Sequence, residues 1–288
     1  MKRLIVTVAL VTVGALTYTS CTAVTPSSGP DPVPVAVAAP AVVALPAPTV
    51  ATTTQPSTTT TTIPWEREPF ALTVSHPPLD DIPDLEFDVA VGAEGPMVSM
   101  LQEHLVEARL YRGALDGENG PWTQQATMAL HKVMDADRSW SWEHEDWGVL
   151  EGFSDVLAER IPDRPDEPNR VEIDLTRQVL YLVLEGEVAA VIPVSSGNGD
   201  QFVNSRGNTV RAKTPQGDFT IQRHIEGLHR SYLGSMWSPW YFRGGYAIHG
   251  SGSVPTQPAS HGCVRVPKWE AEYLDTVLEI GWPVHIWD

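Results

Sequence analysis

Apolar and polar residues alternate, or apolar residues run together in short blocks, from Arg170 to the end of the chain. Positions 171–175 alternate as Val-Glu-Ile-Asp-Leu, 179–184 are almost wholly apolar, and Glu185-Gly186 supplies a turn into 188–194. A period of two, broken by a glycine turn, is typical of neighbouring strands. This part of the chain therefore predicts a β-meander.

Later short apolar runs extend the same character to residues 217–221, 246–248, 263–266 and 284–286. One helix is expected over 268–278, because Pro267 fits a first-turn position. We predict a mainly β domain over residues 170–288.

A helical period appears earlier, over residues 89–135. Val98, Leu101, Leu105 and Ala108 recur at steps of three and four. The Asp-Gly and Gly positions of 116–120 then predict a turn. Thr123 is the expected N-cap of a second helix that carries apolar residues at 126, 130 and 133. The pattern predicts a small α domain.

Residues 136–169 are acidic and rich in tryptophan. Apolar positions between Leu150 and Leu157 predict a helix, and prolines at 162, 165 and 168 then break the chain. We interpret 136–169 as an acidic connector whose charges form a solvated face.

The first 21 residues have the pattern of an export signal. Lys2 and Arg3 precede an apolar run of about a dozen residues, which is short for a membrane-spanning helix. Cys21 resembles the lipidated cysteine of bacterial lipoproteins; the alternative is cleavage nearby and secretion. Residues 22–88 are rich in Pro, Thr and Ala and predict a long disordered linker. We expect an exported protein of the cell envelope.

The net charge and the number of cysteines reduce the range of possible functions. The net charge of −17 argues against nucleic acid as a partner, and an N-terminal lipid would be the only membrane contact. The chain has two cysteines, Cys21 and Cys263. Once Cys21 is removed or acylated, Cys263 is a lone thiol in an oxidising compartment, which favours a chemical role for it.

The segment that contains Cys263 has the residues that thiol catalysis requires. His249-Gly250 is followed, after nine residues, by Ser260-His261-Gly262-Cys263 and then by Arg265. An ordinary thiol is only a few per cent thiolate at neutral pH. A histidine within hydrogen-bond reach accepts the proton and stays beside the sulfur as imidazolium. Both groups lie at expected strand ends, so a short loop can bring them together.

These residues resemble the signature of the L,D-transpeptidase (YkuD-like) catalytic domain: His-Gly, a variable loop, then Ser-His-Gly-Cys and a nearby Arg. A second block of that family, Thr-Pro-x-Gly-x-Phe, is present at residues 214–219. The resemblance implies a YkuD-like β-sandwich with one short helix, and no cofactor or metal.

The same resemblance implies a role for each residue. Cys263 would be the acylated nucleophile, His249 its base, and the carbonyl of Gly250 would orient the imidazole. The oxyanion and substrate site would comprise Ser260, His261, the N–H groups of Gly262 and Cys263, and Arg265, which holds the loop or pairs with a substrate carboxylate.

Residues 89–135 resemble the small three-helix peptidoglycan-binding domain. The positions that carry this likeness are Gly95, Val98, Leu101-Gln102, Leu105, Tyr111, Asp116-Gly117, Gly120, Thr123 and Ala126. His131 stands where a Gln is usual, and a purely structural spacer is the alternative.

Other readings of the candidate residues stay open. His249, His261 and Cys263 are all possible zinc ligands. The aromatic residues Trp237, Trp240, Tyr241 and Phe242 belong to the core or to a lid over the site. His285, in the last expected strand, is interpreted as structural.

The resemblance implies peptidoglycan stem peptides as donor and acceptor, 3-3 cross-links through a thioester, release of terminal D-alanine, and inhibition by carbapenem-type compounds. Water as acceptor would instead give an L,D-carboxypeptidase, and a protein amine would give a protein-to-peptidoglycan ligase. A different class of function is a non-catalytic wall-binding lipoprotein.

Overall fold

The computed structural model describes residues 87–288. The chain divides into units 1–60 and 61–288, and all described residues belong to the second unit. The predicted export signal, Cys21 and nearly all of the linker lie outside the described residues. In the described part, no helix has both the length and the apolar character needed to cross a membrane.

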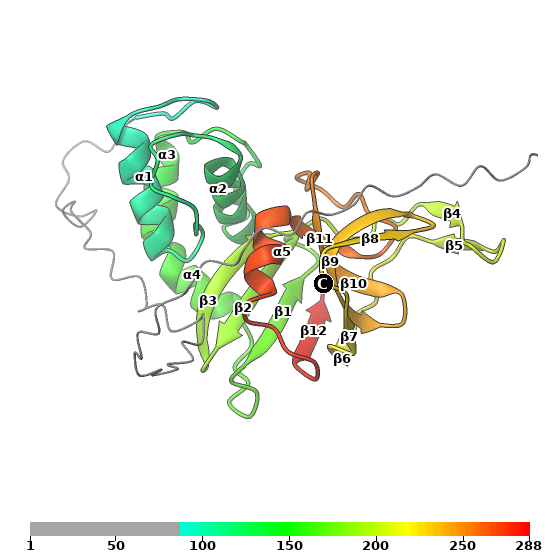
Figure 1. Cartoon of the computed structure of the whole chain (residues 1–288). Helices are drawn as coiled ribbons and strands as arrows, with labels where there is room; N and C mark the ends of the chain where they lie inside the picture. Colours follow the sequence, from blue (N-terminus) through cyan, green and yellow to red (C-terminus); the bar gives the residue numbers. More distant parts are fainter. Residues whose placement is uncertain (1–86) are drawn as a thin grey trace, which may run out of the picture. The chain divides into compact units, whose positions relative to one another are not determined.

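Five helices and twelve strands make up the described chain (Figure 1). The helices are α1 (Pro96–Glu107), α2 (Pro121–Val133), α3 (Glu145–Glu151), α4 (Phe153–Arg160) and α5 (Lys268–Leu274). The strands are β1 (Arg170–Asp174), β2 (Val179–Leu184), β3 (Glu187–Pro193), β4 (Gln201–Val203), β5 (Thr209–Arg211), β6 (Gly217–Thr220), β7 (Arg223–His224), β8 (Leu228–Ser231), β9 (Gly234–Arg243), β10 (Tyr246–Ser251), β11 (Val264–Pro267) and β12 (Pro283–Trp287).

The first sheet has the strand order β3-β2-β1-β12-β6. Its first three strands form the antiparallel meander that the period of two predicts. The last strand of the chain, β12, then joins β1 in parallel, and β6 closes the other edge (Figure 1).

The second sheet has the order β11-β10-β9-β7, with β8 paired to β9 as a hairpin. β10 and β11 run parallel, whereas β9 and β10 are antiparallel. β4 and β5 form a separate two-stranded sheet.

Alternation along β2 divides its side chains between two cores. Leu180 and Leu182 pack in the cluster that includes Ile248 and Val264 of the second sheet. Tyr181, which points the other way, packs with the helices that precede β1. β1 and β2 are therefore buried on both faces. The predicted mainly β fold with one short helix is confirmed.

The helical part is larger than expected. α1 and α2 form where the helical period predicts them, but α3 and α4 join the same core. Trp142, Trp147 and Phe153, from the segment that we interpreted as an acidic connector, are buried there. The helical part thus has four helices rather than the expected three, and two of them come from this segment, because its apolar side chains outweigh the acidic composition around them.

Gln102 accounts for much of the motif in this helical part. Its amide donates to Asp116 Oδ1 at 2.7 Å and to Thr123 Oγ1 at 3.1 Å, and its oxygen accepts from the N–H of Gly117 at 3.0 Å. The Leu-Gln, Asp-Gly and Thr positions therefore hold the turn against α1. Thr123 is not the N-cap as predicted: α2 begins at Pro121, after Gly120.

The helical part and the β domain share direct contacts. Arg112 forms a 2.7 Å ion pair with the buried carboxylate of Glu270 in α5. Trp122 stacks on Trp269 with ring centroids 4.8 Å apart. These contacts fix the helical part to the helix that follows β11.

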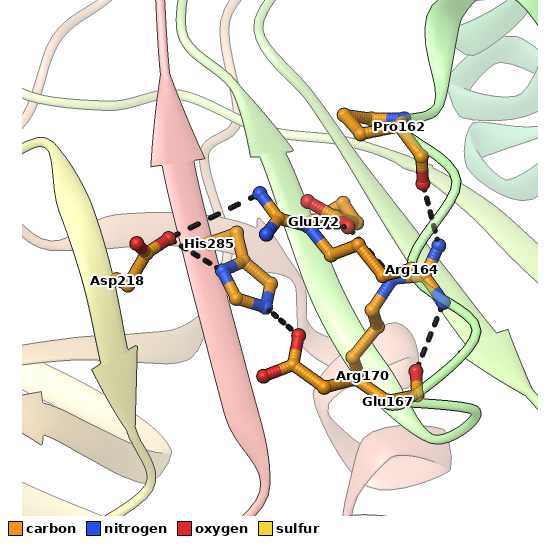
Figure 2. Close-up of polar contacts among 7 residues, drawn as sticks. All are labelled: Pro162, Arg164, Glu167, Arg170, Glu172, Asp218 and His285. Atoms are coloured by element: carbon orange, nitrogen blue, oxygen red, sulfur yellow. Dashed lines mark hydrogen bonds and ion pairs between the residues drawn. The ribbon is translucent and has the colours of Figure 1, made fainter.

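His285 has a structural environment, shown in Figure 2. On β12, its Nδ1 lies 2.6 Å from Asp218 on β6, and its Nε2 lies 2.7 Å from Glu167. The ring thus joins β6 and β12 to the segment that precedes β1.

Arginines continue this network (Figure 2). Arg170 and Arg164 donate to the buried carboxylate of Glu172 at 2.7 and 3.0 Å, and Arg170 also donates to the carbonyls of Glu167 and Pro162. The passage from the helices into the sheet is therefore held by charge-assisted hydrogen bonds.

Lys132 of α2 is buried and donates from Nζ to the carbonyl of Val194 at 2.8 Å. Burial, together with the charge of Arg138, lowers the pKa of Lys132 to about 7. No carboxylate among the described residues forms an ion pair with this lysine. The amine is therefore held by one carbonyl at the junction of the two parts.

We predict that Lys132 makes stability depend on pH. Between pH 7 and the ordinary lysine pKa of 10.5, the unfolded chain holds a proton that the folded chain has released. The free energy of unfolding should therefore rise with pH over this range, and Lys132→Met should remove that rise. Urea denaturation at several pH values measures it, with the exposed Lys213→Met as the matched control. If the difference in unfolding free energy between the wild-type chain and Lys132→Met is the same at every pH, the prediction is wrong.

Candidate active site

The parallel pair β10 and β11 sets the geometry of the candidate site. Ile248 lies opposite Val264, and His249 lies opposite Arg265. Ile248 and Val264 are fully buried in the core between the sheets. Because successive side chains alternate, His249 and Arg265 point away from that core.

Cys263 directly precedes β11, so the same register places it opposite Ala247. Alternation with Val264 turns its thiol to the face that carries His249. From strand spacing and rise, the Cα atoms of Cys263 and His249 lie about 8 Å apart on the diagonal. We call this surface, with Ala247, His249, Cys263 and Arg265, the Cys263 face.

The imidazole of His249 is buried and oriented by its own strand. Its Nδ1 lies 3.0 Å from the carbonyl oxygen of Gly250, the contact that the family resemblance implies. A carbonyl only accepts, so Nδ1 carries the proton and Nε2 keeps a lone pair. This tautomer can act as a base through Nε2.

The thiol of Cys263 is free and half-buried. It lies 3.7 Å from the carbonyl oxygen of Gly245, to which it can donate weakly. The backbone N–H of Ala247 donates to the sulfur from the neighbouring strand. The sulfur thus contacts the backbone of both Gly245 and Ala247.

The electrostatics favour the uncharged forms of both groups. Burial raises the pKa of the Cys263 thiol, and the N–H of Ala247 and the charge of Arg265 oppose that rise. Burial lowers the pKa of His249, the carbonyl of Gly250 opposes this, and Arg265 lowers it further. Both shifts disfavour the thiolate–imidazolium pair that the sequence led us to expect.

Gly262 is required by its backbone and by its neighbours. Its φ is +130°, and an added Cβ would lie 2.6 Å from the ring of Tyr246 and 3.0 Å from the carbonyl oxygen of Lys213. Its carbonyl accepts a 2.8 Å hydrogen bond from Thr214, the first residue of the Thr-Pro block. The two family blocks thus meet directly behind Cys263.

Ser260 accepts a hydrogen bond from one of the two N–H groups that are expected to face an oxyanion. The N–H of Gly262 donates to Ser260 Oγ at 2.9 Å, and Ser260 Oγ donates to the carbonyl of Cys263 at 2.5 Å. His261 is exposed, and its ring makes an edge contact with Phe202 of β4 at 4.8 Å. Ser260 therefore fixes the turn before the nucleophile, and His261 stands at its surface.

Comparison with known proteins decides the family. The model of the YkuD L,D-transpeptidase catalytic domain matches residues 168–286. The crystal structure of the L,D-transpeptidase (residues 123–326) from Xylanimonas cellulosilytica is 39% identical, over 68% of this chain and 96% of that one, with a TM-score of 0.62. The chain belongs to the L,D-transpeptidase family.

More distant structures are also similar. The L,D-transpeptidase (Yku) from Stackebrandtia nassauensis is 22% identical over 69% of this chain and 94% of its own, with a TM-score of 0.40. An L,D-transpeptidase from Mycobacterium smegmatis is 18% identical over 42% and 59%, with a TM-score of 0.34. No curated protein matches the chain. Family membership supports a role in peptidoglycan transpeptidation.

Side chains of the helical part contact the loop between Gly250 and Ser260. Arg138 Nη1 donates to the carbonyl of Thr256 at 2.6 Å, and Gln125 donates to the carbonyl of Val254 at 3.5 Å. The sequence did not indicate these residues, because contacts between distant segments leave no local pattern.

Ser195 is a second residue that the sequence did not indicate. Its backbone exchanges two 3.0 Å hydrogen bonds with Arg265, and its hydroxyl donates to the carbonyl of Gln257 at 2.8 Å. The preceding residue, Val194, accepts from Lys132. The free edge of β11 is thus covered by a segment tied to the helical part.

The remaining candidates divide between core and surface. Trp240 and Phe242 belong to the core, and Trp237 packs against it, whereas Tyr241 points to the Cys263 face. Across residues 87–288, no three His, Cys, Asp or Glu side chains are grouped so that they could hold a metal ion. In the described part of the chain, His249, His261 and Cys263 therefore do not form such a group.

We predict that Cys263 is less acidic in the folded transpeptidase than in the unfolded chain. Iodoacetamide reacts with the thiolate, so the alkylation rate of the Cys263 peptide, followed by mass spectrometry, reports its pKa. The midpoint should lie at higher pH in native protein than in urea, because burial disfavours the anion. A native midpoint below the urea value would instead indicate a stable thiolate–imidazolium pair.

Proposed function

We propose that the chain is an exported peptidoglycan L,D-transpeptidase that forms 3-3 cross-links through Cys263. The observation that carries the proposal is the shared face of Cys263 and His249, with Nδ1 of the imidazole engaged by Gly250 and Nε2 left as base. Thiol, base and ordered backbone are the requirements of acyl transfer.

In the first half-reaction, Cys263 Sγ attacks the carbonyl of the third stem residue as His249 Nε2 takes the thiol proton. The carbon–nitrogen bond then breaks, and the proton passes to the amine of the leaving D-alanine. The product is a thioester. Because burial favours the neutral form of both groups, proton transfer would accompany attack.

In the second half-reaction, a side-chain amine of a neighbouring stem attacks the thioester. His249 accepts the amine proton and returns it to the sulfur as the acyl group leaves. Water or a protein amine in the acceptor position would make the chain an L,D-carboxypeptidase or a protein-to-peptidoglycan ligase by the same steps.

The oxyanion would be stabilised by the N–H groups of Gly262 and Cys263 with His261 beside them. For Gly262 this requires its N–H to exchange Ser260 Oγ for the oxyanion. The charge of Arg265 acts on both Cys263 and His249 and would favour the developing anion.

We infer the location of the enzyme and its contact with the cell wall from the sequence. An export signal, with a lipid on Cys21 or simple secretion, would deliver the chain to the cell envelope, and residues 22–88 would span the distance to the wall. Residues 89–135 would contact peptidoglycan; their motif residues chiefly stabilise the fold through Gln102, so binding would fall to exposed side chains.

A covalent adduct tests the enzyme class. A carbapenem should add one covalent mass to the full chain, and Cys263→Ala should abolish the addition. His249→Gln should slow it by about 10²–10⁴-fold, because the thiol loses its base. A folded wild-type chain that stays unmodified would favour the non-catalytic wall-binding lipoprotein, which should still bind sacculi.

Products from defined tetrapeptide stems test the acceptor. We expect cross-linked dimers with loss of one D-alanine per dimer, and no product from Cys263→Ala. Mass spectrometry distinguishes these dimers from tripeptides, which would instead identify a carboxypeptidase.

A further inference from the structure

A row of four residues crosses the second sheet and ends at the nucleophile. Arg223 on β7 lies opposite Tyr241 on β9, Tyr241 lies opposite Ala247 on β10, and the register of β11 places Cys263 beside Ala247. Three strand spacings separate the ends, about 14 Å between Cα atoms. All four residues therefore belong to the Cys263 face.

The middle of the row is apolar and covered. Ala247 is fully buried and packs with Met236, Tyr241 and Cys263. Between Cys263 and Arg223 the row therefore offers apolar contacts and no charged side chain.

The far end of the row carries a positive charge. The guanidinium of Arg223 lies over the Tyr241 ring, 3.7 Å from its centroid, while the residue itself is exposed. Within residues 87–288, no carboxylate forms an ion pair with Arg223. A guanidinium held flat on a ring keeps its N–H edge available for a planar anion.

Tyr241 links the two ends electrostatically. Burial raises the pKa of Tyr241, the charge of Arg223 opposes the rise, the charge of Cys263 adds to it, and a side-chain hydrogen bond with Arg223 opposes it again. The phenol thus lies within electrostatic reach of both Arg223 and the thiol. On a chain with a net charge of −17, such an unpaired cation near the nucleophile would attract an anionic substrate.

We propose that Arg223, supported by Tyr241, forms a carboxylate subsite for the donor stem peptide. The inference rests on the proposed transpeptidase function and deepens it. The guanidinium lies over β9, two strand spacings from β11. That distance equals about two to three residues of extended peptide, counted from the acylated carbonyl. The leaving D-alanine is only one residue from the acylated carbonyl, so its carboxylate is too close to Cys263 to reach Arg223. The carboxylate that binds Arg223 is therefore one that stays on the acyl-enzyme.

Two synthetic tetrapeptide donors test the subsite on the full chain. They are identical except that the retained carboxylates are free in one and carboxamides in the other. Arg223→Gln should raise KM for the free-acid donor by about tenfold, because a charge-assisted hydrogen bond is lost. KM for the amidated donor and kcat for both donors should not change.

Matched variants distinguish the effect of the Arg223 charge from that of the Tyr241 ring beneath it. Arg230→Gln removes an equally exposed arginine from the neighbouring hairpin strand β8 and should leave both KM values unchanged. Tyr241→Phe keeps the ring under the guanidinium and should retain the preference for the free acid. Tyr241→Leu removes the ring and should weaken that preference.

The outcomes distinguish the two proposals. An equal KM change for both donors in Arg223→Gln, or no change for either, overturns the subsite while transpeptidation stands. An unaltered Cys263 alkylation rate in the variant shows that its fold is intact. Failure of the wild-type chain to turn over either donor overturns the proposed function and the subsite together.

Discussion

The parallel register of β10 and β11 is the constraint on which the site depends. Ile248 and Val264 are buried opposite one another, so the residues beside them must face outward. A shift of one residue would send Cys263 into the core and a valine to the surface. The hydrophobic effect that fixes these two apolar residues therefore also orients the thiol and the imidazole. Ser195 on one edge and β9 on the other prevent the pair from slipping.

Burial also determines which protonation states of Cys263 and His249 are favoured. A pair pressed against an apolar core is stabilised in its uncharged form, and the directions of both pKa shifts agree with this. Such a thiol is less open to adventitious oxidation, since the thiolate is the reactive species. Activation then requires a substrate that brings its carbonyl between the sulfur and the oxyanion donors. The contacts of Lys132 and Arg138 extend this preorganisation into the helical part, which holds the loops around the nucleophile.

The sequence predicted the elements whose patterns are local. The meander, the short helix after Pro267 and the first two helices follow from periods of two and 3.6. β9 was not predicted, because Gly234, Ser235 and Pro239 interrupt any alternation and a proline argues against a strand. The burial of Trp142 and Trp147 was masked by acidic neighbours. Cys263 and His249 could be selected from their motif, but the row that leads to Arg223 depends on strand order, which is a property of long-range pairing.

The spatial pairing of Cys263 with His249 is the central claim, and a bifunctional alkylating agent measures it most directly. 1,3-Dibromoacetone reacts first with the thiol and can then bridge only to a nucleophile within reach of its three-carbon chain. Peptide mapping of the treated chain should find Cys263 joined to His249, since the neutral imidazole keeps its Nε2 lone pair. A bridge from Cys263 to a different residue, or a thiol adduct with no bridge, would contradict the account.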